Sequence, residues 1–257
     1  MSRVARALLL AACAAFGCQQ KPAPPLQVAA AADLAHAFAE LTPAFTAQHP
    51  VDLKLTSGAS GLLAKQLEQG APFDLFLAAN ESYVDQVVKA GACDGSSVQA
   101  YARGRLVIWV KGEGGGALTL TSLADERFAH IAIANPEHAP YGKAAREALT
   151  KAGVWDRVEP RLVYGENVQQ TQQLAQSGNA DVAIVGLSLA LGAPSGSWAT
   201  VDEALYAPLD QALVVCKHGS NSAAARELAA FLKAPAGRGI LKKYGFLLPG
   251  EALAKAP

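Results

Sequence analysis

Short apolar runs alternate with longer amphipathic segments along most of this chain. Apolar runs bounded by turn residues predict strands at 27–32, 51–57, 73–79, 105–111, 130–136, 160–166, 181–186 and 211–217. Segments with helical periodicity lie at 34–49, 61–70, 81–91, 141–153, 168–178 and 223–235. Strands that alternate with helices predict an α/β fold with mostly parallel sheets.

Residues 58–74 and 165–181 resemble each other. Aligned without a gap, at an offset of 107 residues, they share Gly58/Gly165, Gln66/Gln173, Leu67/Leu174, Gln69/Gln176 and Asp74/Asp181. Ordinary βαβ patterning could also produce these matches. One sheet with this many strands would be unusually wide, however, so we predict two similar lobes.

The lobes are expected to be discontinuous in sequence. We assign 26–104 plus 207–257 to lobe 1 and 105–206 to lobe 2, with linkers near 101–105 and 202–210. The C-terminal segment is then expected to pack back on lobe 1.

The first residues are typical of an export signal. Two arginines precede an apolar run that is too short to cross a bilayer, and small residues follow. Ala15-Phe16-Gly17-Cys18 resembles a lipobox, which predicts a signal peptide over 1–18 and a lipid on Cys18. Cys13 is a second candidate for lipidation, and ordinary secretion is the alternative. Residues 19–25 form a Pro-rich spacer.

Composition narrows the function classes. A hydrophobic content of 51% excludes a mostly disordered chain. Without Arg3 and Arg6, 20 basic and 22 acidic residues remain, a net charge of 20 − 22 = −2, with no basic tract for nucleic acid. Cys93 and Cys216 are too few for a zinc cluster, and an exported location permits a disulfide between them.

Common catalytic and metal motifs are missing. The five histidines show neither H-x-H nor HExxH spacing, so we assign no metal. Around Ser60, the sequence SGASG lacks the second glycine of a nucleophile elbow. EHAPYGKAA has Ala144 where a P-loop places Ser or Thr.

Four predicted helix starts, which follow Ala32, Ala59, Pro140 and Asn167, lie at the carboxyl ends of strands. Such helix starts present unpaired N–H groups and a partial positive charge. They therefore predict an anion site without cationic side chains, in a cleft between the lobes. Ser60 is expected to cap its helix, to donate a hydrogen bond to the anion, or both.

The segments AAADL, TSGASG, IANPEHAPYGKAA, GENVQQ and KKYGF, in this order and spacing, resemble the periplasmic molybdate-binding proteins of molybdate ABC transporters over residues 27–247. The resemblance implies a type II periplasmic binding fold with a two-segment hinge and a ligand cleft. It also implies a monomeric receptor that binds molybdate or tungstate, uses no cofactor and delivers its cargo to a membrane permease.

The same resemblance implies the binding residues. They are Asp33, Ser60, the backbone amide of Tyr141, the amide of Val168, and Gly186. Two positions depart from the family: well-known members have Ser in place of Asp33 and Tyr in place of Gly186.

Asp33 opposes anion binding if it is ionised. Two unit charges ~5 Å apart repel by roughly 3 kcal/mol at an effective dielectric near 20, and a dianion by about twice that. A helix N-terminus returns only ~0.3–2 kcal/mol. We therefore expect Asp33 to turn away and cap its helix. The alternatives are a carboxyl that shares a proton with the ligand, a different small anion or protonated acid as cargo, or an enzyme with Asp33 as a base near Ser60 or Tyr141.

Overall fold

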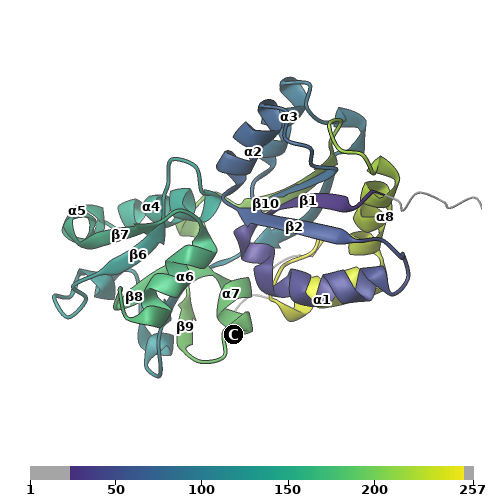
Figure 1. The fold of residues 1–257 in the computed structure, drawn as a ribbon. Coiled ribbons are helices and arrows are strands. Elements are labelled where there is room, and N and C mark those ends of the chain that lie inside the picture. Colours follow the sequence, from purple (N-terminus) through teal and green to yellow (C-terminus); the bar gives the residue numbers. More distant parts are fainter. Residues whose placement is uncertain (1–23, 252–257) are drawn as a thin grey trace, which may run out of the picture.

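The computed structural model describes residues 24–251, which form two α/β lobes side by side (Figure 1). The predicted signal peptide, Cys18 and Cys13 lie outside the described residues. Within residues 24–251, no helix is both long and apolar enough to cross a bilayer.

Lobe 1 is built on a five-stranded sheet with the order β2-β1-β3-β10-β4. Its strands are β1 (Leu26–Ala31), β2 (Leu53–Gly58), β3 (Leu75–Ala78), β4 (Gln99–Gly104) and β10 (Leu209–Val215). Its helices are α1 (Ala35–Thr46), α2 (Ser60–Glu68), α3 (Glu81–Lys89), α8 (Ser222–Lys233) and α9 (Pro235–Lys243). The helices α1, α8 and α9 pack on one face of the sheet, and α2 and α3 on the other.

Lobe 2 repeats this arrangement with the order β7-β6-β8-β5-β9. Its strands are β5 (Leu106–Val110), β6 (Ile131–Ala134), β7 (Leu162–Gly165), β8 (Val182–Gly186) and β9 (Ser197–Thr200). Its helices are α4 (Pro140–Lys151), α5 (Trp155–Val158), α6 (Val168–Ser177) and α7 (Leu187–Gly192). Short 3₁₀ turns lie at Ala32–Leu34, Gly95–Ser97, Gly115–Ala117, Thr121–Ala124, Glu159–Arg161 and Glu203–Leu205.

The predicted α/β fold with two similar lobes is confirmed, but each sheet is mixed. In lobe 1, β1 runs parallel to β2 and β3, whereas β10 runs antiparallel to β3 and β4. In lobe 2, β5 takes the place of β10 and runs antiparallel to β8 and β9. The reason is that β5 and β10 enter directly from the other lobe, without the crossover helix that parallel strands need.

Two strands were not predicted. The segment 101–105 was expected to be a linker, but most of it belongs to β4, which pairs with β10. β9 is a short edge strand whose residues are half-buried or exposed. Such a strand does not need a continuous apolar sequence, so β9 has no apolar run by which it could be recognised. The chain passes between the lobes at Arg105 and again between β9 and β10.

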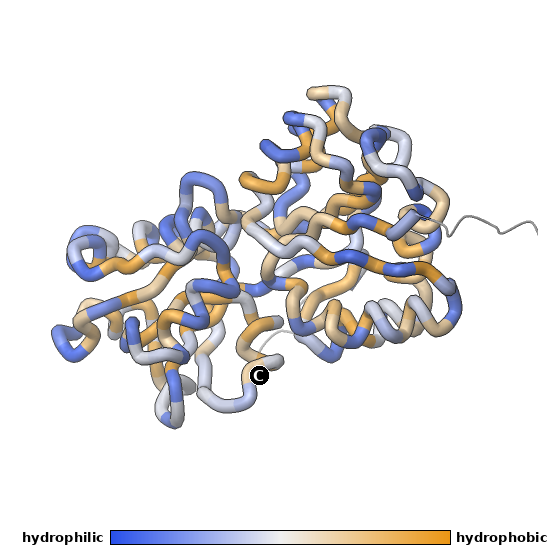
Figure 2. The backbone as a smooth tube through the Cα atoms, viewed as in Figure 1, coloured by the Kyte–Doolittle hydropathy of each residue, from blue (hydrophilic) through white to orange (hydrophobic). Residues whose placement is uncertain are grey.

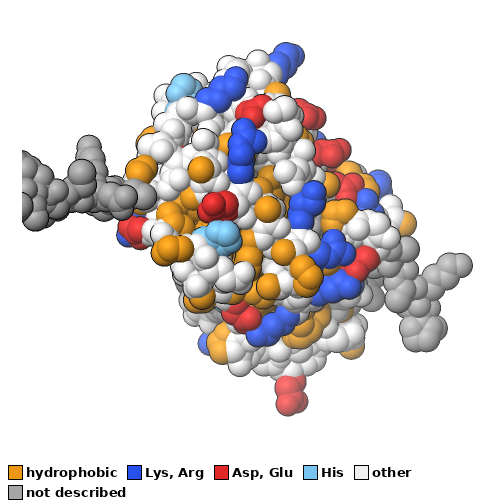
Figure 3. All heavy atoms as spheres, turned by 90° about the vertical axis from the view of Figure 1, so that its right-hand side faces the viewer, with side chains coloured by type: hydrophobic (Ala, Val, Ile, Leu, Met, Phe, Trp, Pro, Cys, Tyr) orange, Lys and Arg blue, Asp and Glu red, His pale blue; other side chains and the backbone are white. Residues whose placement is uncertain are grey.

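Apolar residues concentrate in the strands, and the outer helix faces are polar (Figure 2). Buried side chains such as Val28 and Leu75 in lobe 1 and Ile133 and Ile184 in lobe 2 form the sheet cores. On the outer face of lobe 1, acidic and basic side chains are interspersed (Figure 3). That face therefore carries no continuous basic surface for a polyanion.

A disulfide joins Cys93 and Cys216. Cys93 follows α3 and Cys216 follows β10, and their backbones also pair as an isolated bridge. The disulfide therefore links the chain after α3 to the end of β10, which is the last strand of lobe 1 in sequence order.

Candidate functional site

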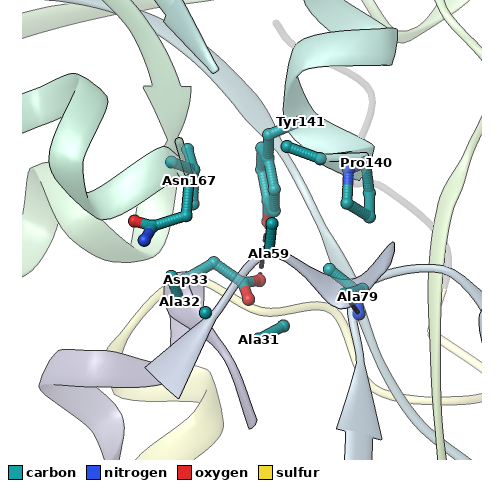
Figure 4. A pocket seen from close by; sticks show the side chains of 12 residues that line it. Ala31, Ala32, Asp33, Ala59, Ala79, Pro140, Tyr141 and Asn167 are labelled. Atoms are coloured by element: carbon teal, nitrogen blue, oxygen red, sulfur yellow. Dashed lines mark hydrogen bonds between the residues drawn. The ribbon is translucent and has the colours of Figure 1, made fainter. Parts of the chain in front are cut away.

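The four predicted helix starts meet at one small pocket between the lobes (Figure 4). The pocket is lined by Ala31, Ala32, Asp33, Gly58, Ala59, Ser60, Ala79, Ala139, Pro140, Tyr141, Asn167 and Val168. These residues include no Lys, Arg or His, and Asp33 is the single carboxyl group among them.

Small side chains let the lobes approach each other at this pocket. Ala31, Ala32, Ala59 and Ala79 come from lobe 1 but pack into the apolar core of lobe 2. Larger side chains at these positions would hold the lobes apart. The alanines at the end of β1 therefore serve the contact between lobes as well as the strand.

Backbone N–H groups are available at three of the helix starts. Among the described residues, no acceptor is bonded to the amides of Ser60, Tyr141 or Val168. All three residues lie in the first turn of a helix, where the helix itself supplies no acceptor. They can donate to an anion in the pocket.

Ser60 is fully buried, and its Oγ accepts a hydrogen bond of 3.0 Å from the amide of Ala79. It is the first residue of α2, its side chain makes no capping bond, and Ala59 holds the cap position. The capping prediction for Ser60 is therefore wrong. Because Oγ only accepts in this bond, its hydroxyl hydrogen can still be donated to a ligand.

Asp33 is also fully buried, and it does not cap a helix. The strand β1 leads directly into the 3₁₀ turn Ala32–Leu34, so Asp33 lies inside the turn and Ala31 holds the cap position. The expectation that Asp33 turns away to cap its helix is therefore wrong.

The carboxyl group of Asp33 instead accepts two side-chain hydrogen bonds on one oxygen. Oδ2 accepts from the hydroxyl of Tyr141 at 2.9 Å and from Nε2 of Gln211 at 2.5 Å (Figure 4 shows the first). Oδ1 is buried and has no partner among the described residues.

Burial sets the protonation chemistry of this group. Desolvation raises the pKa of Asp33 from 3.8 to about 6, although the hydrogen bonds from Gln211 and Tyr141, and the nearby backbone amides of Asp33 and Leu34, act to lower it. Burial, and then the charge of Asp33, raise the pKa of Tyr141 and Tyr101 well above 10. Both tyrosines are therefore neutral hydrogen-bond donors.

Gln211 and Tyr101 were missed by the sequence analysis. The hydroxyl of Tyr101 donates to Oε1 of Gln211 at 2.6 Å, and both side chains are buried. The sequence signal that could have found Gln211 is a polar side chain in the otherwise apolar strand β10. A polar side chain that is buried in a strand needs a hydrogen-bond partner, so it indicates a polar network nearby.

Gly186 does not line the pocket. A Cβ at this position would lie 3.0 Å from Cε1 of Tyr141, and a Cβ at Gly104 would collide with the Tyr141 hydroxyl. Both glycines therefore make room for Tyr141. Of the five predicted site residues, the structure brings Asp33, Ser60, Tyr141 and Val168 together at the pocket and places Gly186 behind the Tyr141 ring.

Three hydrogen bonds close the lobes around the pocket. The Tyr141 hydroxyl bonds to Asp33, the Ser188 hydroxyl donates to the Asp33 carbonyl at 2.7 Å, and the amide of Gly61 donates to the carbonyl of His138 at 3.0 Å. Each bond joins one lobe to the other.

The described residues contain no group of three or more His, Cys, Asp or Glu side chains that could hold a metal ion. The pocket instead offers a hydroxyl and several backbone amides. Such neutral donors suit a small anion.

Two α/β lobes that are joined by two chain crossings and enclose a small donor-rich pocket define a solute-binding receptor. Residues 26–247 match the family model described as bacterial extracellular solute-binding protein, so the chain belongs to this family. The family consists of receptors that bind solutes and not of enzymes.

Three relatives illustrate the similarity. The molybdate-binding protein ModA of Rhodobacter capsulatus is 37% identical over 85% of this chain and 86% of its own length. A putative ABC transporter substrate-binding lipoprotein of Bacillus subtilis, YvgL, is 30% identical over 86% of this chain and 85% of its own length. The solved structure of the periplasmic molybdate-binding protein of Azotobacter vinelandii aligns with a TM-score of 0.82 and 30% identity, over 87% of this chain and 99% of that one.

Proposed function

We propose that this protein is the extracytoplasmic receptor of an ABC importer and that it binds molybdate or tungstate in the inter-lobe pocket. The observation that carries the proposal is the convergence of helix starts from both lobes on a pocket without cationic side chains. Relatives named for molybdate binding, at 30% identity and above, support this ligand over a different small anion.

In this proposal Ser60 donates its hydroxyl hydrogen, and the amides of Tyr141 and Val168 donate from lobe 2. A ligand that bonds to both lobes stabilises the closed arrangement through its higher affinity for that arrangement. The hinge consists of the two chain crossings, between lobe 1 (26–104 plus 207–257) and lobe 2 (105–206). The closed receptor is then the form that a membrane permease recognises.

The location and assembly belong to the same proposal. The signal-like segment 1–18 directs export, Cys18 carries a lipid anchor, and the receptor acts as a monomer. The disulfide between Cys93 and Cys216 supports an oxidising, extracytoplasmic location. Mass spectrometry of the membrane fraction, with and without Cys18→Ala, tests the anchor.

Isothermal titration with sodium molybdate tests the cargo. We expect Ser60→Ala to weaken molybdate binding about 10- to 100-fold, because a hydrogen bond to a charged group contributes about 1.5–3 kcal/mol. Ser82→Ala is the matched control, since Ser82 is an exposed serine in the first turn of α3, outside the pocket. Failure of the wild-type protein to bind either molybdate or tungstate would contradict the proposed function.

A further inference from the structure

Asp33 is the one pocket residue whose chemistry conflicts with a dianion. Asp33 lines the pocket, and its Oδ1 is buried without a hydrogen bond of good geometry among the described residues, although the backbone amides of Asp33 and Leu34 lie near the carboxyl group. A buried oxygen without a partner is costly, and an ionised carboxylate beside a dianion adds charge repulsion.

The hydrogen-bond network determines which oxygen could carry a proton. The Tyr101 hydroxyl donates to Oε1 of Gln211, so the amide group of Gln211 must present its Nε2 hydrogens to Asp33. Oδ2 of Asp33 thus receives hydrogens from both Gln211 and Tyr141 and acts as an acceptor. Only Oδ1 is left to carry the proton of a neutral carboxylic acid.

We propose that Asp33 binds the oxyanion as a neutral carboxylic acid, with the hydrogen on Oδ1 donated to a ligand oxygen, and that the receptor therefore takes up one proton with each dianion. This inference rests on the proposed function and deepens it. The proton comes from solvent and stays on Oδ1, so no bond of the ligand is broken. Asp33 then adds a donor to the pocket instead of a negative charge.

The surroundings of Asp33 favour this proton. The titratable groups that face it are the neutral tyrosines Tyr141 from α4 and Tyr101 from β4; Tyr206, beyond Tyr141, is also neutral because burial raises its pKa to about 12. His36 on α1 is kept neutral because burial lowers its pKa. Within residues 24–251, no cation therefore holds Asp33 in its ionised form.

The ligand strengthens the same tendency. Burial already raises the pKa of Asp33 to about 6 in the ligand-free protein. A dianion in the pocket raises it further, because two like charges at close range oppose ionisation. Above pH 6 the free protein is ionised and the complex is protonated, so one proton enters with each ligand.

The pH dependence of affinity tests this inference. For the wild-type protein between pH 6.5 and 8.5, where molybdate is a dianion, we expect Kd for molybdate to rise about tenfold per pH unit. Titrations at pH 7.5 in buffers of different ionisation enthalpy should give an uptake of about one proton per ion bound. Asp33→Asn should show neither the slope nor the uptake.

Two further variants separate the outcomes. Asp33→Ser offers a hydroxyl donor that does not titrate and should also bind with a pH-independent Kd. Asp94→Asn is the matched control, since Asp94 does not line the pocket and its hydrogen bonds with Ser96 and Arg226 lower its pKa to about 2. It should keep the wild-type slope.

A wild-type Kd that does not change with pH, or a slope that persists in Asp33→Asn, would overturn the inference and leave the proposed function intact. Loss of molybdate binding in the wild-type protein at every pH would overturn both. Thermal unfolding of each variant establishes that it is folded.

Discussion

At the scale of single residues, the pocket depends on how Asp33 and Tyr141 fit together. Tyr141 reaches across from lobe 2 to bond to a carboxyl group of lobe 1, and the glycines at 104 and 186 give it the space to do so. The buried Tyr141 hydroxyl and Oδ2 of Asp33 thus satisfy each other's hydrogen bonding. The free-energy cost of burying the carboxyl group falls on Oδ1, which lacks a partner among the described residues.

Asp33 should make the stability of the ligand-free protein depend on pH. Its folded pKa of about 6 exceeds the usual 3.8, so its contribution is complete below pH 4 and is lost as pH rises to about 6. A pKa difference of this size corresponds to about 3 kcal/mol. Urea unfolding at pH 4 and pH 7 should show the wild-type protein losing about this much stability relative to Asp33→Asn. An unchanged difference would contradict the prediction.

Gly186 should be coupled to Tyr141. Gly186→Val should destabilise the protein by about 1–3 kcal/mol, because the new side chain overpacks the site against the Tyr141 ring. In a Tyr141→Ala background the same change should cost much less, which a double-mutant cycle of urea unfolding measures. Gly239→Ala in α9, where a Cβ meets no atom within 4 Å, is the control and should not destabilise the protein. If Gly186→Val cost the same in both backgrounds, Tyr141 would not be the group that restricts the side chain at position 186.

At the scale of secondary-structure elements, the helix starts at the pocket keep backbone N–H groups open. Away from the pocket, α3 and α8 have asparagine caps at Asn80 and Asn221. At the pocket, α2 and α4 begin without a side-chain cap. α6 is capped by Asn167 only at the amide of Gln170, which leaves the amide of Val168 open. Elsewhere, α1, α5, α7 and α9 also begin without a side-chain cap, so the pocket is distinguished by the convergence of open helix starts from both lobes.

The disulfide should stabilise the α3 side of lobe 1. It links positions 123 residues apart, and loss of a native disulfide typically costs about 2–5 kcal/mol. We expect Cys93→Ala/Cys216→Ala to lose stability in this range in urea unfolding. Molybdate affinity should change little in the folded variant, because neither cysteine lines the pocket. A large loss of affinity with little loss of stability would contradict this prediction.

At the scale of the whole molecule, both lobes contribute to one small site, so ligand binding and lobe closure are a single equilibrium. The lobes are already in contact through Tyr141, Ser188 and Gly61. A ligand adds bonds to both sides and should stabilise the folded, closed form as a unit.

Molybdate should therefore raise the thermal unfolding midpoint. At a free concentration of 100 times Kd the stabilisation is about 2.7 kcal/mol. For a protein of this size that corresponds to roughly 5–10 °C, which differential scanning fluorimetry detects. Sodium chloride at equal ionic strength is the control. An equal shift with chloride would indicate a general salt effect.

The helix starts of the pocket could be predicted from sequence because each is a local pattern of strand, small residues and amphipathic helix. The local pattern gave the helix starts after Ala32, Ala59, Pro140 and Asn167, the family resemblance named Ser60, Tyr141 and Val168, and the internal similarity predicted two lobes. The strands β4 and β9 could not, since each is paired through a neighbour distant in sequence and lacks an apolar run.

The partners of Asp33 could not be predicted for the same reason. Gln211 is 178 residues away from Asp33, and Tyr141 is 108 residues away. A local reading of Asp33 before an apolar helix favours a cap, whereas the tertiary structure supplies buried donors from β10 and α4. Contacts between distant segments decided the role of this residue.

The central place of β10 in the sheet of lobe 1 has a consequence for how the chain folds. β10 lies between β3 and β4, whereas all strands of lobe 2 precede it in the chain. A nascent polypeptide can therefore complete the second lobe while the first still has two unpaired strand edges. Until Leu209–Val215 is made, those edges are open to wrong partners, and a holding chaperone would protect them.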